Sequence, residues 1–198
     1  MSVTKKSACI EFFCPVNEHT VTQMLDLAKQ LRKNGIERLK ILISSGGGSV
    51  FHAISAYNEL KGLGIEIVTH NFGSVDSSSG IIFCAGSKRY SVPHARFLIH
   101  PLGMTLNGNF TEEQMEEQLK SFKIDVENTA GVLAEATNKD ESQILKDMQD
   151  RKHLNPEQAK DYGLIDDIKI ELVEAGEELH KVNSTPPQQN IPMPFRLG

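Results

Sequence analysis

The sequence of 198 residues has few cysteines, no long hydrophobic run and no excess of positive charge. Its three cysteines (Cys9, Cys14 and Cys84) are too few and too scattered for a disulfide framework or a zinc site, so we expect a reducing cytoplasm. No apolar segment approaches the roughly 20 residues of a membrane helix, and the N-terminus lacks the apolar stretch of a signal peptide. The formal net charge of −5 gives no reason to expect nucleic-acid binding. The histidines form no close ligand pair, so we assign no metal and no cofactor.

Short apolar strands alternate with amphipathic helices through the first half of the chain. Strands are expected at 8–14, 39–44, 65–70, 88–93 and 95–100, and helices at 21–31, 50–60 and 79–86. This alternation favours crossover connections and a mainly parallel sheet, which is an α/β fold.

The pattern changes after residue 103. Asn-Gly within the segment 104–110 is a hairpin or tight-turn signal, and Thr111 with Gln114 resembles a capping box that opens a long helix to about Thr137. Apolar side chains form one stripe of this helix, and the opposite face is charged. A helix of this length after a hairpin projects readily from a domain, so its stripe must be covered by another subunit or by the chain's own sheet.

The C-terminal third continues with helices predicted at 140–148 and 155–163 and a last strand at 164–172. From Glu174 onward the chain is rich in glutamate and then carries four prolines, which exclude regular structure. We therefore expect one domain, 1–173, followed by a flexible tail, 174–198.

Three consecutive serines, Ser77, Ser78 and Ser79, stand directly before an apolar segment. One interpretation is an ordinary helix N-cap. The other is a nucleophile at a helix N-terminus, where unpaired N–H groups can bind an oxyanion. Acyl transfer by serine also needs a histidine as base and a carboxylate that orients it. His100 and Asp150 are the candidates for base and carboxylate. On its own, however, a histidine at a strand end is usually structural, and a carboxylate at the position of Asp150 is by default a solvated charge at a helix end.

Four segments, in this order, resemble the proteolytic subunit of the Clp protease, within the wider Clp/crotonase superfamily. "ISSGGGSV" (43–50) is similar to that family's Ile-Asn-Ser-Pro-Gly-Gly-Ser-Val turn, and "GSVDSSSGIIFCAG" (73–86) to its Gly-Gln-Ala-Ala-Ser-Met-Gly segment with the following helix. "PHARFLIHPLG" (93–103) resembles Pro-Asn-Ser-Arg-x-Met-Ile-His-Gln-Pro. "QDRKHLNPEQAKDYGLID" (149–166) resembles Arg-Asp-Arg-x-x-x-x-Pro-Glu-Ala-x-x-Tyr-Gly-Leu-Val-Asp. The resemblance covers roughly residues 8–170.

The resemblance implies an α/β fold of the Clp/crotonase type, a superhelix of repeated β-β-α units with a projecting hairpin and long helix (104–137) as a handle between two rings. It implies a serine endopeptidase. In that enzyme Ser77 attacks the peptide carbonyl and His100 is general base and then general acid. Asp150 orients the imidazole, and the backbone N–H groups of Gly48 and Ser78 bind the oxyanion.

The partners implied by the resemblance are polypeptide substrates and copies of the same chain in stacked, heptameric rings. An ATP-driven (AAA+) unfoldase is also implied, but the short segment before the first strand counts against it. The sequence departs from the family pattern at Asp76, beside the expected nucleophile, at Gln149, where an arginine is usual, and at Pro101, which follows His100 directly. Two other classes stay open: a crotonase-like acyl-CoA enzyme, which needs no serine triad, and a catalytically silent ring or scaffold subunit.

Overall fold

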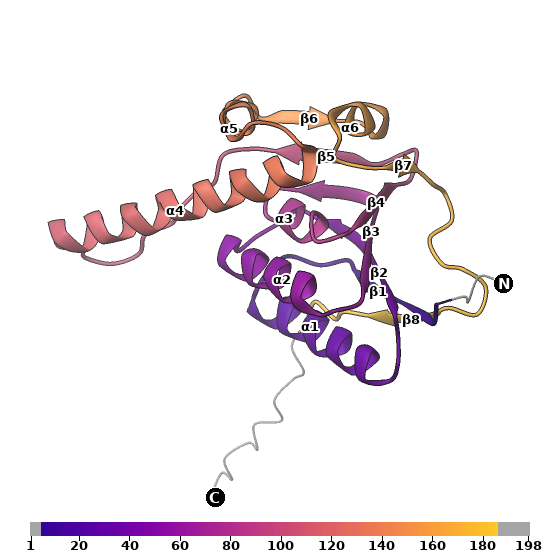
Figure 1. Cartoon of the computed structure of the whole chain (residues 1–198). Coiled ribbons are helices and arrows are strands. Elements are labelled where there is room, and N and C mark those ends of the chain that lie inside the picture. The colour runs from indigo at the N-terminus through magenta and orange to yellow at the C-terminus, as the bar shows by residue number, and fades with distance from the viewer. Residues whose placement is uncertain (1–4, 186–198) are drawn as a thin grey trace, which may run out of the picture.

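A sheet of eight strands forms the centre of the computed structural model, which describes residues 5–185 (Figure 1). The strands are β1 (Ser7–Phe12), β2 (Arg38–Ser45), β3 (Glu66–Asp76), β4 (Lys88–Ser91), β5 (Arg96–Ile99), β6 (Lys152–Leu154), β7 (Asp167–Ile168) and β8 (Glu178–Lys181). They are ordered β6-β5-β3-β2-β1-β8, and β4 pairs with both β3 and β7. Every pair is parallel except β5 with β6, so the predicted, mainly parallel α/β fold is confirmed.

Strand β3 is longer than predicted, and it pairs with two strands, β4 and β5, in addition to β2. Its first part, Val68 to Asn71, pairs with β4, and its last part, Ser74 to Asp76, pairs with β5. The change of partner follows a register shift against β2 between Ile43 and Ser45. This shift carries the end of β3 beside the end of β5, and the candidate site lies at that edge.

The helices are α1 (Glu18–Lys33), α2 (Val50–Gly62), α3 (Ser79–Phe83), α4 (Glu112–Thr137), α5 (Glu141–Gln149) and α6 (Pro156–Tyr162). Figure 1 shows α1 and α2 against the sheet and the small unit α5, β6 and α6 stacked at its β5 end. The amphipathic helix predicted at 21–31 corresponds to α1, and its apolar face is buried, because Met24, Ala28 and Leu31 all lie in the core. Among residues 5–185, no helix combines the length and the apolar character needed to cross a membrane.

Helix α4 projects from the domain (Figure 1). It begins with the predicted capping box, in which the Thr111 hydroxyl accepts from the Gln114 N–H and the Gln114 side chain accepts from the Thr111 N–H. Only the C-terminal part of its stripe is buried within the chain, around Leu133. Met115 and Leu119 are about half exposed, at 54% and 48%. The chain's own helices α2, α3 and α5, rather than its sheet, therefore cover one end of the stripe, and the rest is open to another molecule.

The hairpin predicted at 104–110 is not formed, because residues 101–111 contain no strand. The Asn-Gly signal does mark a bend, at which Gly108 has a φ of +108°. The side chains of 103–111 are all exposed, including the apolar Met104, Leu106 and Phe110, so the described chain does not cover the apolar face that a hairpin needs for stability.

The tail predicted from residue 174 is also wrong in its first part. Residues 178–181 form β8, which pairs in parallel with β1 from Ala8 to Glu11. Its approach is fixed by Glu177, whose carboxylate lies 3.1 Å from the Nζ of the buried Lys40. An open strand edge and a buried amine both need partners, and this segment supplies them. The four prolines of the tail lie outside the described residues.

The strand predicted at 164–172 is reduced to the two residues of β7, because only Asp167 and Ile168 find partners on β4.

Candidate active site

The chain turns sharply at Ser77, between the end of β3 and the start of α3. Ser77 has a φ of 58°, in the left-handed region that a residue with a Cβ rarely adopts. Its N–H donates to the Leu98 carbonyl at 3.0 Å, and its own carbonyl accepts from the Gly80 N–H at 2.9 Å. Backbone strain of this kind is concentrated at functional sites, where the surrounding structure must hold it.

The three serines have different surroundings. Ser79 is fully buried, and its hydroxyl lies 2.7 Å from the Asp76 carbonyl oxygen and 3.1 Å from that of Ser45. Ser78 is buried too, but its hydroxyl has no hydrogen-bond partner among residues 5–185 and makes no cap bond to α3. Ser77 is half-buried and faces a cavity. Capping of α3 therefore does not explain the serine run.

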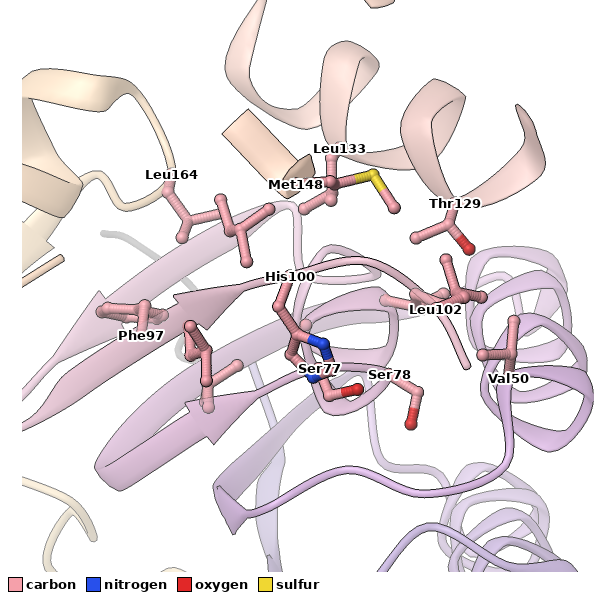
Figure 2. A pocket seen from close by; sticks show the side chains of 15 residues that line it. Val50, Ser77, Ser78, Phe97, His100, Leu102, Thr129, Leu133, Met148 and Leu164 are labelled. Carbon is pink, nitrogen blue, oxygen red and sulfur yellow. The ribbon is translucent and has the colours of Figure 1, made fainter. Parts of the chain in front are cut away.

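The cavity beside Ser77 is open at its mouth, has apolar walls and holds about 450 Å³ including that mouth. Its polar lining consists of Ser77, Ser78, His100 and Thr129. The apolar side chains come from four helices, two strands and two connecting segments: Val50, Val75, Ile81, Phe97, Leu98, Ile99, Leu102, Leu133, Met148 and Leu164. In Figure 2, Leu133 and Met148 lie above His100, and Val50 lies to the right of Ser78.

His100 follows the last residue of β5 and lies over Ser77 in Figure 2. Its position follows from the pairing of β5, which lies parallel to β3 on one side and antiparallel to β6 on the other. The Nδ1 atom is 2.7 Å from the Pro101 carbonyl oxygen. Because a carbonyl oxygen only accepts hydrogen bonds, Nδ1 carries the hydrogen, which leaves the Nε2 lone pair of the neutral ring free to take a proton.

Asp150, the third predicted residue, is not part of this cavity. It is exposed at the C-terminal end of α5, and its carboxylate makes no hydrogen bond or ion pair with His100. The chain turns again at Arg151, with a φ of 51°, before it enters β6. The structure thus brings Ser77 and His100 to one cavity and leaves Asp150 on the surface.

The glycine turn after β2 approaches Ser77 from the other side. Gly47 has a φ of +85°, and a Cβ there would lie 2.7 Å from the Ser77 Cβ and 2.7 Å from the Asp76 carbonyl oxygen. Gly48 forms an isolated bridge with Val16. Within residues 5–185, the N–H groups of Gly48 and Ser78 have no hydrogen-bond acceptor, as an oxyanion site requires. The glycine in direct contact with Ser77 is Gly47, which the sequence did not single out from its neighbours.

Asp76, the unexpected carboxylate next to Ser77, is paired. It is buried, and its Oδ2 accepts from the Arg96 guanidinium at 2.6 Å. Arg96 is the first residue of β5, so this ion pair also ties β5 to β3. Electrostatically, the pairing compensates the charge that Asp76 adds beside Ser77.

A second buried carboxylate holds α5, β6 and α6 together. Asp147 accepts hydrogen bonds from the Tyr162 hydroxyl at 2.6 Å, from Lys152 at 3.0 Å and from Gln143 at 3.1 Å. Burial by itself raises the pKa of Asp147, but these donors outweigh it and lower the pKa below its usual range. The same burial and hydrogen bond raise the pKa of Tyr162. The sequence had marked neither residue.

We expect Asp147→Asn to make the protein less stable at neutral pH and less sensitive to acid. The pKa of this carboxyl group is lower in the folded protein than in the unfolded chain, where it is about 3.9. Its contribution to the stability of the fold is therefore complete above about pH 3.9 and is lost as the pH falls through the pKa of the folded state. Removing the charge should lower the free energy of unfolding at pH 7 by about 1–3 kcal/mol. Chemical denaturation at pH 7 and pH 3.5 measures both effects.

The matched control is Asp161→Asn, an exposed carboxylate on α6, which should leave both values unchanged. An Asp147→Asn variant whose stability falls as steeply with acid as that of the unmodified protein would contradict this account.

The parallel β-α units, the strained serine between β3 and α3, and the projecting α4 define the Clp/crotonase type of α/β fold. The sequence model of the Clp protease family matches residues 6–171. The chain is 27% identical over 157 residues to the ATP-dependent Clp protease proteolytic subunit 2 of Chlamydia abortus, which covers 78% of this chain and 74% of that protein. It is 30% identical over 132 residues to proteolytic subunit 1 of Corynebacterium jeikeium, with coverage of 66% and 69%.

The structure is similar to that of a ClpP1 mutant from Listeria monocytogenes, with a TM-score of 0.73 and 25% sequence identity over 81% of this chain and 90% of that one. The chain belongs to the Clp protease family. The resemblance read from the four sequence segments is confirmed.

Proposed function

We propose that this protein is a serine endopeptidase that cleaves unfolded proteins or peptides inside a chamber of oligomeric rings. The observation that carries the proposal is the placement of Ser77 and His100 at one cavity, with Ser77 in a strained turn beside unpaired backbone N–H groups. Membership of the Clp protease family supports the same chemistry.

In the proposed mechanism the Ser77 hydroxyl attacks the peptide carbonyl, while Nε2 of His100 takes its proton. The N–H groups of Gly48 and Ser78 stabilise the oxyanion of the tetrahedral intermediate. His100 then gives the proton to the leaving amine, and water completes the cycle by the same steps. Asp150 stays the proposed orienting acid, and its carboxylate has to leave the surface to reach Nδ1. Catalytic hydrogen bonds often tighten only when substrate is bound.

The walls of the cavity suggest what lies next to the scissile bond. Phe97, Leu133 and Met148 line it and are almost fully buried. A charged substrate side chain placed there would lose its hydration without gaining a partner. We therefore propose an apolar residue on the substrate at this position.

The partners proposed for the protein are polypeptides and copies of the chain. The open part of the α4 stripe supports a contact between subunits, and we retain stacked, heptameric rings as the proposed assembly. The names of the relatives describe ATP-dependent proteases, which supports an AAA+ unfoldase as a further partner. The cytoplasmic location stays a prediction.

A fluorophosphonate probe, combined with native mass measurement, tests the nucleophile and the assembly together. We expect one probe molecule to attach to each subunit of an oligomeric ring, and the label to disappear in Ser77→Ala while the ring mass is kept. An intact ring that takes up no probe would contradict the proposal and would favour a crotonase-like enzyme or a silent subunit.

A further inference from the structure

His100 has a hydrogen-bond acceptor of its own in the neighbouring residue. The backbone of a residue before proline is restricted to extended conformations, and the proline ring fixes its own φ near −65°. Both restrictions act on the His100–Pro101 unit and limit the movement of the Pro101 carbonyl. That carbonyl lies 2.7 Å from Nδ1 of His100, at the distance of a good hydrogen bond.

The orienting group of a serine protease has two separable tasks. It selects the ring tautomer with hydrogen on Nδ1, and it stabilises the positive ring that forms when Nε2 takes the serine proton. A carbonyl oxygen performs the first task fully, because it can only accept. It contributes to the second through its dipole. The carboxylate of Asp150 performs neither task in this structure, since it is exposed and outside the cavity.

We propose that the main-chain carbonyl of Pro101 is an orienting acceptor for His100, in addition to Asp150. The Ser77–His100 pair then keeps its productive tautomer even when the carboxylate is lost. Pro101 is a positioning residue, since it acts through His100. This inference rests on the proposed peptidase function and deepens it.

The first test is Asp150→Asn in the assembled, full-length protein. Where the carboxylate is the sole acceptor, this change lowers kcat about 10⁴-fold, because the new amide selects the wrong tautomer. Here we expect kcat to fall by about tenfold or less, with KM unchanged. We also expect ¹⁵N NMR of histidine-labelled protein to keep the Nδ1–H signal of His100. The control Asp140→Asn removes another exposed carboxylate at the opposite end of α5 and should change neither value.

The second test removes the restraint on the carbonyl. Pro101→Gly removes the restraint on the backbone between His100 and this carbonyl, and we expect it to lower kcat a few-fold while Asp150 is present. Combined with Asp150→Asn, it removes the carboxylate and leaves the carbonyl without its restraint, so we expect the double variant to lose far more activity than the product of the two single losses. Thermal unfolding and native mass establish that each variant folds and assembles.

Two results would overturn the inference while the unmodified protein is active. One is a loss of 10³-fold or more in Asp150→Asn, with a shift of the hydrogen to Nε2. The other is a double variant whose loss is simply the product of the single ones. If the unmodified protein neither reacts with the fluorophosphonate probe nor cleaves peptides, the proposed function itself fails, and this inference fails with it.

Discussion

Ser77→Ala is expected to abolish peptide hydrolysis while leaving the subunit folded and assembled. Loss of the serine nucleophile in such enzymes typically lowers kcat by roughly 10⁶-fold. The fold should survive, because the Ser77 hydroxyl makes no hydrogen bond within the described chain and alanine keeps the Cβ that already tolerates a φ of 58°. Peptide hydrolysis, thermal unfolding and native mass measure the three properties separately.

The two neighbouring serines are the controls for this result. Ser78→Ala removes a buried hydroxyl that has no partner in the described part of the chain, so activity should stay within a few-fold and stability should not fall. Ser79→Ala removes the hydroxyl that bonds the Asp76 and Ser45 carbonyls, and it should lower the free energy of unfolding by about 1–3 kcal/mol. If hydrolysis survives in Ser77→Ala but is lost in Ser78→Ala or Ser79→Ala, the assignment of the nucleophile is wrong.

Gly47→Ala is expected to inactivate the site from the opposite side. The added Cβ would lie 2.7 Å from the Ser77 Cβ and from the Asp76 carbonyl oxygen, so the serine turn or the glycine turn must move. Either movement displaces the N–H group of Gly48 relative to Ser77. Loss of one oxyanion donor typically lowers kcat 10²–10³-fold, and we expect a loss of about this size. The left-handed φ of Gly47 adds a stability cost of about 1 kcal/mol or more.

The adjacent Gly46 provides a matched control. It has no positive φ, and apart from its chain neighbours no atom of the described residues lies within 4 Å of a Cβ built there, so Gly46→Ala should keep both kcat and stability close to those of the unmodified protein. Kinetics and thermal unfolding of the two variants side by side distinguish a steric effect at Ser77 from a general loss of loop flexibility. Equal activity of Gly47→Ala and Gly46→Ala would show that the contact with Ser77 does not matter.

Local patterns allowed much of this molecule to be predicted. The capping box at Thr111, the buried stripe of α1 and the parallel strands were each visible in a few neighbouring residues, because helix and strand periodicities are local properties. The order of four short segments was enough to predict the family, which the comparisons confirmed. The candidates Ser77 and His100 also came from those segments.

Other features depended on residues far apart in the chain. The pairing of β8 with β1 required an open strand edge and the buried Lys40, which no local pattern around residue 178 reveals. The hairpin at 104–110 shows the opposite case: the local turn signal was present, but no strands form there, because the segment is exposed to solvent.

The sequence by itself determined most of the elements, the family and two residues that meet at the cavity, Ser77 and His100. Only the tertiary structure decided how they meet: the strain at Ser77, the contact of Gly47 with it, and the position of Asp150 away from His100. The physical reason is that residue type and spacing act over one or two turns of chain. The conformation of a turn and the partner of a polar atom are set by whichever distant segment packs against them.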